Sequence, residues 1–190
     1  MAFGGDDERT VRNLLTAYDT EMNAHARYKV YAAKADEESF LGVGSLFRAA
    51  ARAEQIHASN QARALRQSGG EARANVVPAE VASTLENLQE ALKGEKQEIE
   101  VLYPKFAEDA LAGINALATR AFTLAMEAEK THVELYTGAI AQIESGDAGS
   151  WVHVARDFHV CPMCAFTTDQ KVESNCPVCG YPSERFETVA

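Results

Sequence analysis

Two pairs of glutamate and histidine have the spacing of a metal-binding helix face. Glu54 is followed three residues later by His57, and Glu129 is followed three residues later by His132. Residues i and i+3 lie on the same face of an α-helix, so each pair can hold one metal ion. One such pair alone would indicate little. Two pairs, each late in a long Ala-rich helical stretch, predict a site for two metal ions.

Further glutamates precede each pair at closely matching distances. Glu21 lies upstream of the first pair, and Glu95 and Glu98 lie upstream of the second. A glutamate from each of two helices, with a Glu-x-x-His from each of two others, forms the two-metal carboxylate site of four-helix bundles. The predicted ligand set is Glu21, Glu54, His57, Glu95, Glu98, Glu129 and His132.

These residue types suit iron, because carboxylates can bridge two cations and imidazole binds iron without adding charge. Five carboxylates in a helical core would repel each other and lose their hydration, at a cost of several kcal/mol each if unpaired. Two divalent ions would nearly neutralise them. We therefore expect the metals to be part of the fold.

Three aromatic side chains could support this site. His25 follows Glu21 by four residues and lies on the same helix face, either as a ligand or ligand partner or as a packing residue. Tyr28 and Tyr103 could hydrogen-bond to ligand carboxylates, which would orient them. Both tyrosines could equally be core residues, and the two roles are compatible.

All four cysteines lie near the C-terminus, in two Cys-x-x-Cys pairs separated by eleven residues: Cys161, Cys164, Cys176 and Cys179. Two such pairs predict tetrahedral all-sulfur coordination, which fits iron or zinc. Gly180 follows the last cysteine, whereas Ala165 occupies the matching place in the first pair. The spacing leaves open both an electron-carrying iron site and a structural zinc ribbon.

Helical periodicity predicts the elements that position these residues. We expect helices over 6–36, 40–67, 79–110 and 114–144. The connection at 71–79 must cross the bundle if the second and third helices are not simple antiparallel neighbours. Pro104 should kink the third helix just after Tyr103. We expect a linker from Gly146 to about Arg156. The remainder, from His153 or Phe158 to Ala190, is too short for a core of its own and needs a metal to stabilise it. The expected domains are a four-helix bundle over 1–148 and a small four-cysteine β domain over 149–190.

Composition excludes several classes of function. The net charge of −10 argues against nucleic acid and anionic membranes as partners. No stretch approaches the roughly 18 apolar residues of a membrane span. The acidic N-terminus lacks the features of a signal peptide. We therefore expect a cytoplasmic protein.

The chain resembles rubrerythrin in several segments. They are Glu21-x-x-Ala24-x-x-x-Tyr28, Glu54-x-x-His57, Gly94-Glu95-x-x-Glu98 followed by Tyr103-Pro104, Ala128-Glu129-x-x-His132, and the C-terminal cysteines. The resemblance implies a ferritin-like diiron four-helix bundle with a C-terminal rubredoxin-like domain. The second glutamate of the Glu95/Glu98 pair is typical of rubrerythrins. In that family, Glu98 and His57 would alternate as ligands of one iron, Glu54 and Glu129 would bridge, and Glu21, Glu95 and His132 would be terminal.

The resemblance also implies a function: a non-haem peroxidase of the NADH peroxidase type that reduces hydrogen peroxide to water in oxidative-stress defence. Electrons would come from a reductase or a rubredoxin through the four-cysteine iron. The two sites are expected to lie too far apart within one subunit, so a head-to-tail homodimer would bring them together. Two alternatives remain open, a ferroxidase that handles iron and a non-catalytic bundle carrying a zinc-ribbon interaction module.

Overall fold

The structure, a computed structural model, describes residues 5–146, 149 and 151–190. The elements, in chain order, are α1 (Gly5–Glu37), α2 (Leu41–Gln67), α3 (Thr84–Gln97), the π-helical turn η1 (Glu98–Leu102), α4 (Tyr103–Ala112), α5 (Ala116–Glu144), β1 (Phe158–Val160), β2 (Thr167–Thr168), the 3₁₀ turn η2 (Ser183–Arg185) and β3 (Glu187–Val189). Among the described residues, no helix is both long and apolar enough to cross a membrane.

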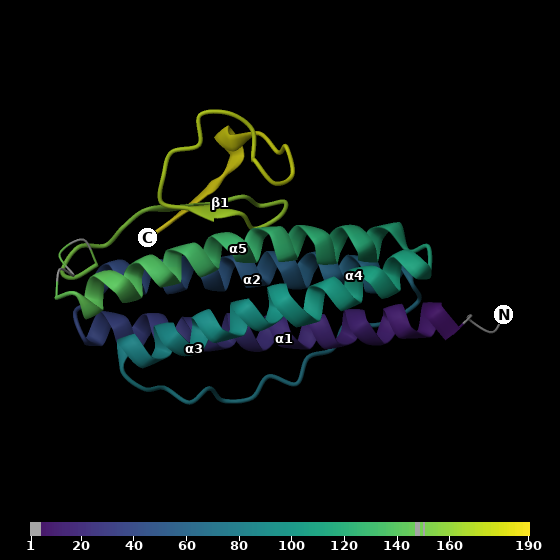
Figure 1. The fold of residues 1–190 in the computed structure, drawn as a ribbon, viewed down its shortest axis with the longest axis horizontal. Coiled ribbons are helices and arrows are strands. Elements are labelled where there is room, and N and C mark those ends of the chain that lie inside the picture. Colours follow the sequence, from purple (N-terminus) through teal and green to yellow (C-terminus); the bar gives the residue numbers. More distant parts are fainter. Residues whose placement is uncertain (1–4, 147–148, 150) are drawn as a thin grey trace.

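The long helices form a bundle of four rods, with α3, η1 and α4 following one another as the third (Figure 1). α1 and α2 are antiparallel neighbours. The connection after α2 then runs back along the outside of the bundle, so that α3 and α4 run in the same direction as α2. The second and third rods are therefore not antiparallel neighbours, which is the case in which the sequence requires a crossing connection. It lets all four rods turn a ligand-bearing face toward one axis.

Two predicted helix starts are wrong by a few residues, and capping side chains explain why. The third helix begins at Thr84 rather than 79, because Ser83 and Glu86 form a reciprocal capping box. The last bundle helix begins at Ala116 rather than 114, because the Asn115 side chain accepts a hydrogen bond from the Ala118 N–H at 3.0 Å.

The predicted kink after Tyr103 is replaced by a π-helical turn just before it. The Tyr103 N–H donates to the carbonyl of Glu98, five residues back, rather than to the fourth residue back. Pro104 has no N–H to continue the α-helical pattern, and the wider turn accommodates this lack. The irregularity therefore begins at Glu98, one of the predicted ligands.

Alanines pack the helices closely, and aromatic rings fill the remaining space at one end of the metal site. Tyr28, Phe47 and Tyr136 are buried. The ring centroid of Tyr136 lies 6.0 Å from that of Tyr28 and 5.7 Å from that of Phe47. These distances are typical of packed aromatic pairs. The aromatic cluster closes the bundle interior against water on that side.

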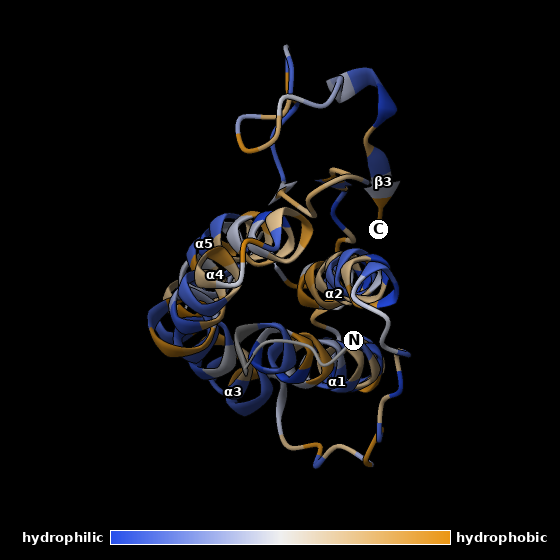
Figure 2. Cartoon of the chain, turned by 90° about the vertical axis from the view of Figure 1, so that its right-hand side faces the viewer, coloured by the Kyte–Doolittle hydropathy of each residue, from blue (hydrophilic) through white to orange (hydrophobic). Residues whose placement is uncertain are grey.

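The C-terminal segment forms a small antiparallel sheet with strand order β2-β1-β3, stacked against α2 and α5 (Figure 2). Arg52 on α2 forms a two-pronged ion pair with Glu187, with N–O distances of 2.5 and 2.7 Å. Asn60, also on α2, donates to the carbonyl of Met163 at 2.9 Å. The predicted boundary at 148/149 falls at the edge of the described residues, since 147–148 and 150 lie outside them, and it stays a prediction.

Candidate metal centres

Six of the seven predicted diiron ligands meet in the middle of the bundle, in two overlapping groups. One group is Glu21, Glu54, His57 and Glu129, and the other is Glu54, Glu95, Glu129 and His132. Within each group, the candidate ligand atoms all lie within 4.8 Å of one another. All six side chains are buried. α1, α2, α3 and α5 each contribute, so the site exists only when all four rods have packed.

Glu54 and Glu129 belong to both groups, and each turns one oxygen toward each histidine. His57 Nδ1 lies 3.0 Å from Glu54 Oε2 and 2.8 Å from Glu129 Oε1. His132 Nδ1 lies 3.7 Å from Glu54 Oε1 and 2.5 Å from Glu129 Oε2. A carboxylate shared in this way is positioned to bridge two cations.

Unpaired buried atoms test whether these residues fit a pair of metal ions. Within the described part of the chain, carboxylate oxygens of five glutamates are buried without a hydrogen-bond partner, as is His132 Nδ1; the glutamates are Glu21, Glu54, Glu95, Glu98 and Glu129. Buried acceptors of this kind are costly unless something positive lies between them. Carboxylate oxygen and imidazole nitrogen are donors that suit iron. The residues therefore fit two iron ions.

Without metal, burial and mutual repulsion disfavour the charged form of most of these carboxylates. Burial, followed by the charge of Glu129, raises the pKa of Glu95 to about 7. Burial, followed by the charge of neighbouring glutamates, also raises the pKa values of Glu21 and Glu54 well above the ordinary range. For His57, burial lowers the pKa, but the charge and hydrogen bond of Glu129, together with the charges of Glu21 and Glu95, outweigh burial and raise the pKa to about 9. Without metal, protons must supply the missing positive charge.

Two tyrosines and a glutamine hold the outer carboxylates in place. The Tyr28 hydroxyl donates to Glu95 Oε1 at 2.6 Å, and the Tyr103 hydroxyl donates to Glu21 Oε1. Sequence reasoning missed Gln61, whose amide nitrogen lies 3.1 Å from Glu21 Oε1 and 3.0 Å from the Tyr103 oxygen. Its position four residues after His57, on the same helix face, was the available signal.

Glu98 and His25 lie outside both groups. Glu98 is buried at the start of the π-helical turn, and one of its carboxylate oxygens has no hydrogen-bond partner among the described residues. Its role as a ligand stays a prediction. His25 is only partly buried, and its Nδ1 lies 2.6 Å from the Ala51 carbonyl on α2. His25 thus contacts the backbone of the neighbouring helix.

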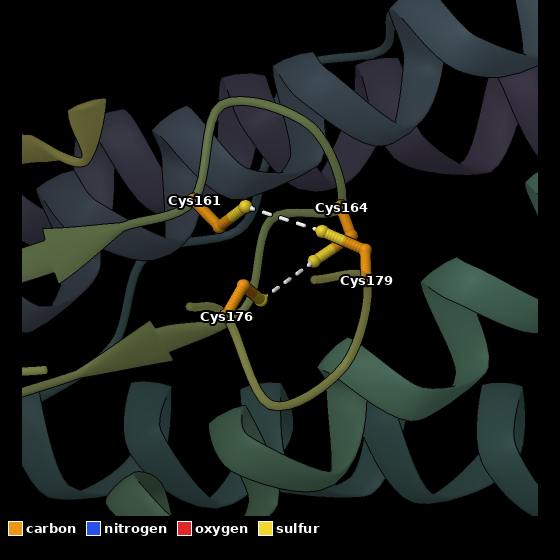
Figure 3. Close-up of side chains that lie close together, drawn as sticks. All are labelled: Cys161, Cys164, Cys176 and Cys179. Carbon is orange, nitrogen blue, oxygen red and sulfur yellow. Dashed lines mark hydrogen bonds between the residues drawn. The ribbon is translucent and has the colours of Figure 1, made fainter. Parts of the chain in front are cut away.

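The four cysteine sulfurs point toward one another at the edge of the small sheet (Figure 3). Cys161 Sγ lies 3.6 Å from Cys179 Sγ, and Cys164 Sγ lies 3.5 Å from Cys176 Sγ. Metal–sulfur bonds of about 2.3 Å in a tetrahedron place sulfurs roughly 3.8 Å apart. The arrangement therefore fits one tetrahedral iron or zinc ion.

The two cysteine loops have the same backbone geometry despite Ala165 standing where the second loop has Gly180. Ala165 has a φ of 67° and Gly180 a φ of 74°. Their N–H groups donate to the carbonyls of Cys161 and Cys176, both at 2.9 Å. The N–H of the following residue also bonds to sulfur in each loop. Alanine thus adopts the left-handed conformation that glycine adopts easily.

The two metal sites are in direct contact within one chain. His57 Nε2 lies 3.3 Å from the carbonyl oxygen of Cys164, and both groups are buried. The expectation that the two sites are too far apart within one subunit is therefore wrong, because the small domain packs on its own bundle. The homodimer stays a prediction, and it is not needed to bring the sites together.

Comparison with known proteins points to one family. A family model described as Rubrerythrin matches residues 12–140. Rubrerythrin-2 of Clostridium acetobutylicum is 34% identical over 177 residues, which cover 92% of this chain and 93% of that protein. Nigerythrin of Nitratidesulfovibrio vulgaris is 32% identical over 178 residues, which cover 93% of this chain and 85% of that protein.

Solved structures show the same fold. Nigerythrin in its fully reduced, all-ferrous state superposes with a TM-score of 0.83 at 30% identity, covering 99% of this chain and 88% of that one. A Desulfovibrio desulfuricans bacterioferritin superposes with a TM-score of 0.71 at 18% identity, covering 79% of this chain and 90% of that one. The second likeness shows the ferritin-like fold of the bundle alone. With its diiron site in the bundle and its four-cysteine site for iron or zinc, this chain belongs to the rubrerythrin family.

Proposed function

We propose that this protein is a peroxidase of the NADH peroxidase type, which reduces hydrogen peroxide to water in defence against oxidative stress. The observation that carries the proposal is the contact between His57 Nε2 and the Cys164 carbonyl. It joins a site suited to two-electron chemistry with a site suited to passing single electrons. Two irons held in the bundle would supply the two electrons that cleavage of the O–O bond requires, one from each metal.

The side chains around the site would bind the metals and handle protons. The proposed ligands are Glu21, Glu54, His57, Glu95, Glu98, Glu129 and His132. Reduction of one hydrogen peroxide to two waters consumes two electrons and two protons. The Tyr28 hydroxyl, hydrogen-bonded to Glu95, and the Tyr103 hydroxyl, hydrogen-bonded to Glu21, are placed to hold protons beside the carboxylates. We propose that both tyrosines contribute to catalysis.

Glu98 supports the proposal in a second way. It is 7% exposed and lies beside the two groups without belonging to either. Burial, followed by the charge of Glu21, raises its pKa well above the ordinary range. A buried carboxyl group next to the site, outside both ligand groups, is consistent with the exchange of Glu98 and His57 as ligands of one iron that the family resemblance implies.

The four cysteines of the small domain differ in exposure, which suggests a route for electrons. Cys161 and Cys164 are fully buried toward the bundle, whereas Cys179 is partly exposed on the outer loop. We propose that a reductase or a rubredoxin delivers electrons, one at a time, at the outer loop. They would leave through Cys164 toward His57. This route requires iron, rather than zinc, between the four sulfurs.

Peroxide addition to the reduced protein tests the proposal. Anaerobically reduced protein is mixed with hydrogen peroxide while the absorption bands of both iron sites are followed. The iron–thiolate band should return after the diiron site is oxidised. In the Glu54→Ala variant, which removes a bridging carboxylate, that band should stay bleached. If it also stays bleached in the unchanged protein, the electron-relay proposal fails.

Steady-state turnover separates this function from iron oxidation and storage. A peroxidase consumes hydrogen peroxide for as long as an electron donor is supplied. A ferroxidase stops when Fe(II) is exhausted. Metal analysis and colour answer the remaining question about the small domain, because ferric iron in four thiolates is red and zinc is colourless.

A further inference from the structure

Both histidines of the bundle site use their second ring nitrogen to contact the small domain. His57 Nε2 faces the Cys164 carbonyl, and His132 Nε2 lies 3.2 Å from the hydroxyl oxygen of Thr167 on β2. The Nδ1 atoms of both rings face the carboxylates. The short segment from Cys164 to Thr167 therefore contacts both histidines.

The direction of the hydrogen bonds at Thr167 follows from its neighbours. The Thr167 hydroxyl lies 2.8 Å from the Ala165 carbonyl, which can only accept, so the hydroxyl donates its one hydrogen there. Its oxygen is left to accept from His132 Nε2–H. Nε2 must then carry a hydrogen, so Nδ1, which faces Glu129, is the nitrogen left to bind a metal ion.

The helix that carries His132 also holds Thr167 in place. The Thr167 N–H donates to the Thr131 hydroxyl oxygen at 3.3 Å, and that hydroxyl donates to the Ala128 carbonyl at 2.7 Å. Thr167 is 1% exposed and His132 is fully buried. Without this acceptor, Nε2–H would be left buried and unpaired, a cost that favours opening of the contact between β2 and α5 to water.

We infer that Thr167 is a positioning residue for the diiron site: its hydroxyl fixes the ring orientation and the hydrogen position of His132, so docking of the small domain completes the bundle site. The inference rests on the proposed role of His132 as a metal ligand. It gives the small domain a second task, independent of electron transfer. Outer partners of metal-binding histidines commonly have this effect.

Three variants of β2 test the inference in protein loaded with zinc at both sites and labelled with ¹⁵N-histidine. Thr167→Val keeps the shape and removes the acceptor, whereas Thr167→Ser keeps the hydroxyl. Thr168→Val is the matched control, because the Thr168 hydroxyl accepts from the Gln170 N–H at 3.0 Å and does not contact His132. Zinc lets the His132 Nε2–H resonance be followed without paramagnetic broadening.

In the unchanged protein, Thr167→Ser and Thr168→Val, the His132 Nε2–H resonance should exchange slowly with water. In Thr167→Val it should exchange quickly or vanish, and zinc affinity at the bundle site should fall about 10- to 100-fold. Retained slow exchange and affinity in Thr167→Val would overturn the inference. An equal loss in Thr168→Val would also overturn it, because the effect would then be general loosening.

The readouts also separate this inference from the proposed function. Zinc-loaded protein does not reduce peroxide, so the resonance and the affinity are independent of turnover. If the iron-loaded protein lacks peroxidase activity and Thr167→Val still shows both changes, the peroxidase proposal fails and the positioning role stands. If turnover is normal and Thr167→Val changes neither readout, only the positioning role fails.

Discussion

His57 Nε2 donates a hydrogen bond to the carbonyl oxygen of Cys164 across 3.3 Å, so a metal ligand of the small domain touches a predicted ligand of the bundle. His57 and Cys164 are 107 residues apart in sequence, and this one hydrogen bond joins the two metal sites. The contact depends on the small domain keeping its place on α2. The side chains that anchor the first cysteine loop should therefore affect electron transfer without belonging to either metal site.

Asn60 offers a test of that anchoring, since its amide donates to the Met163 carbonyl beside Cys164. Asn60→Ala should slow the return of the iron–thiolate band after peroxide addition, because a lost hydrogen bond of about 1 kcal/mol loosens the loop. The rate at which peroxide oxidises the diiron site should not change. Gln170→Ala, an exposed change on the same domain, is the control. Equal rates in both variants would contradict the prediction.

Metal-free protein should lose stability as the pH rises from about 4.5 to about 9. The lower limit is the ordinary pKa of Glu95, and the upper limit is the raised pKa of His57. Raised carboxyl pKa values mean that the folded chain keeps protons that the unfolded chain has lost, so this stability is present at low pH and disappears as the pH rises. The raised pKa of His57 acts in the same direction, and its contribution is lost as the pH rises through about 9. The pKa of Glu129 is lowered by His57 and His132 despite its burial, so its contribution has the opposite sign but changes only below about pH 4.5, outside this window.

Metal-loaded protein should show the opposite slope, because the ligands must lose protons to bind metal. Urea unfolding of both forms, at several pH values across this window, measures the two slopes. A metal-free protein whose stability rises with pH would show that these carboxylates are not buried together.

Gln61→Leu should weaken metal binding without destabilising the metal-free fold. The amide of Gln61 orients Glu21 and Tyr103, and losing such a partner commonly costs about 10-fold in metal affinity. The amide oxygen of Gln61 is itself buried without a hydrogen-bond partner in the described structure, so leucine removes an unfavourable group. Competition with a metal chelator measures the affinity, and Gln55→Leu on the exposed face of α2 is the control. Unchanged affinity in Gln61→Leu would rule out the positioning role.

Local patterns predicted the bundle well because its ligands follow helical spacing. Glu54 and His57 share a face wherever a helix forms, and the buried groups observed around them contain six of the seven predicted side chains. Ser83 followed three residues later by Glu86 is the sequence pattern of a capping box, and this pattern predicts that α3 starts at Thr84. Helix ends are decided by such single hydrogen bonds rather than by periodicity.

Contacts between the two domains could not be predicted in this way. Thr167 meets His132 only because a short strand docks beside α5, and no periodic relation links residues 35 positions apart. The π-helical turn at Glu98 could not be predicted either, since its position reflects packing of the third rod as well as Pro104. Both features depend on tertiary packing, which sequence spacing does not record.

Gly180→Ala and Gly138→Ala should change stability in opposite directions, although a new methyl group would have open space at both positions. Gly180 has a φ of 74°, where an L-residue costs about 1–2 kcal/mol. Gly138 lies inside α5 with ordinary helical geometry, where alanine is favoured over glycine by about 0.5–1 kcal/mol. Denaturant unfolding at fixed metal content, followed at the thiolate band for Gly180→Ala and by helical circular dichroism for Gly138→Ala, measures each change. Because Ala165 already tolerates a φ of 67° in the first loop, Gly180→Ala should still bind its metal, and loss of the metal would show that glycine is required there for more than its backbone conformation.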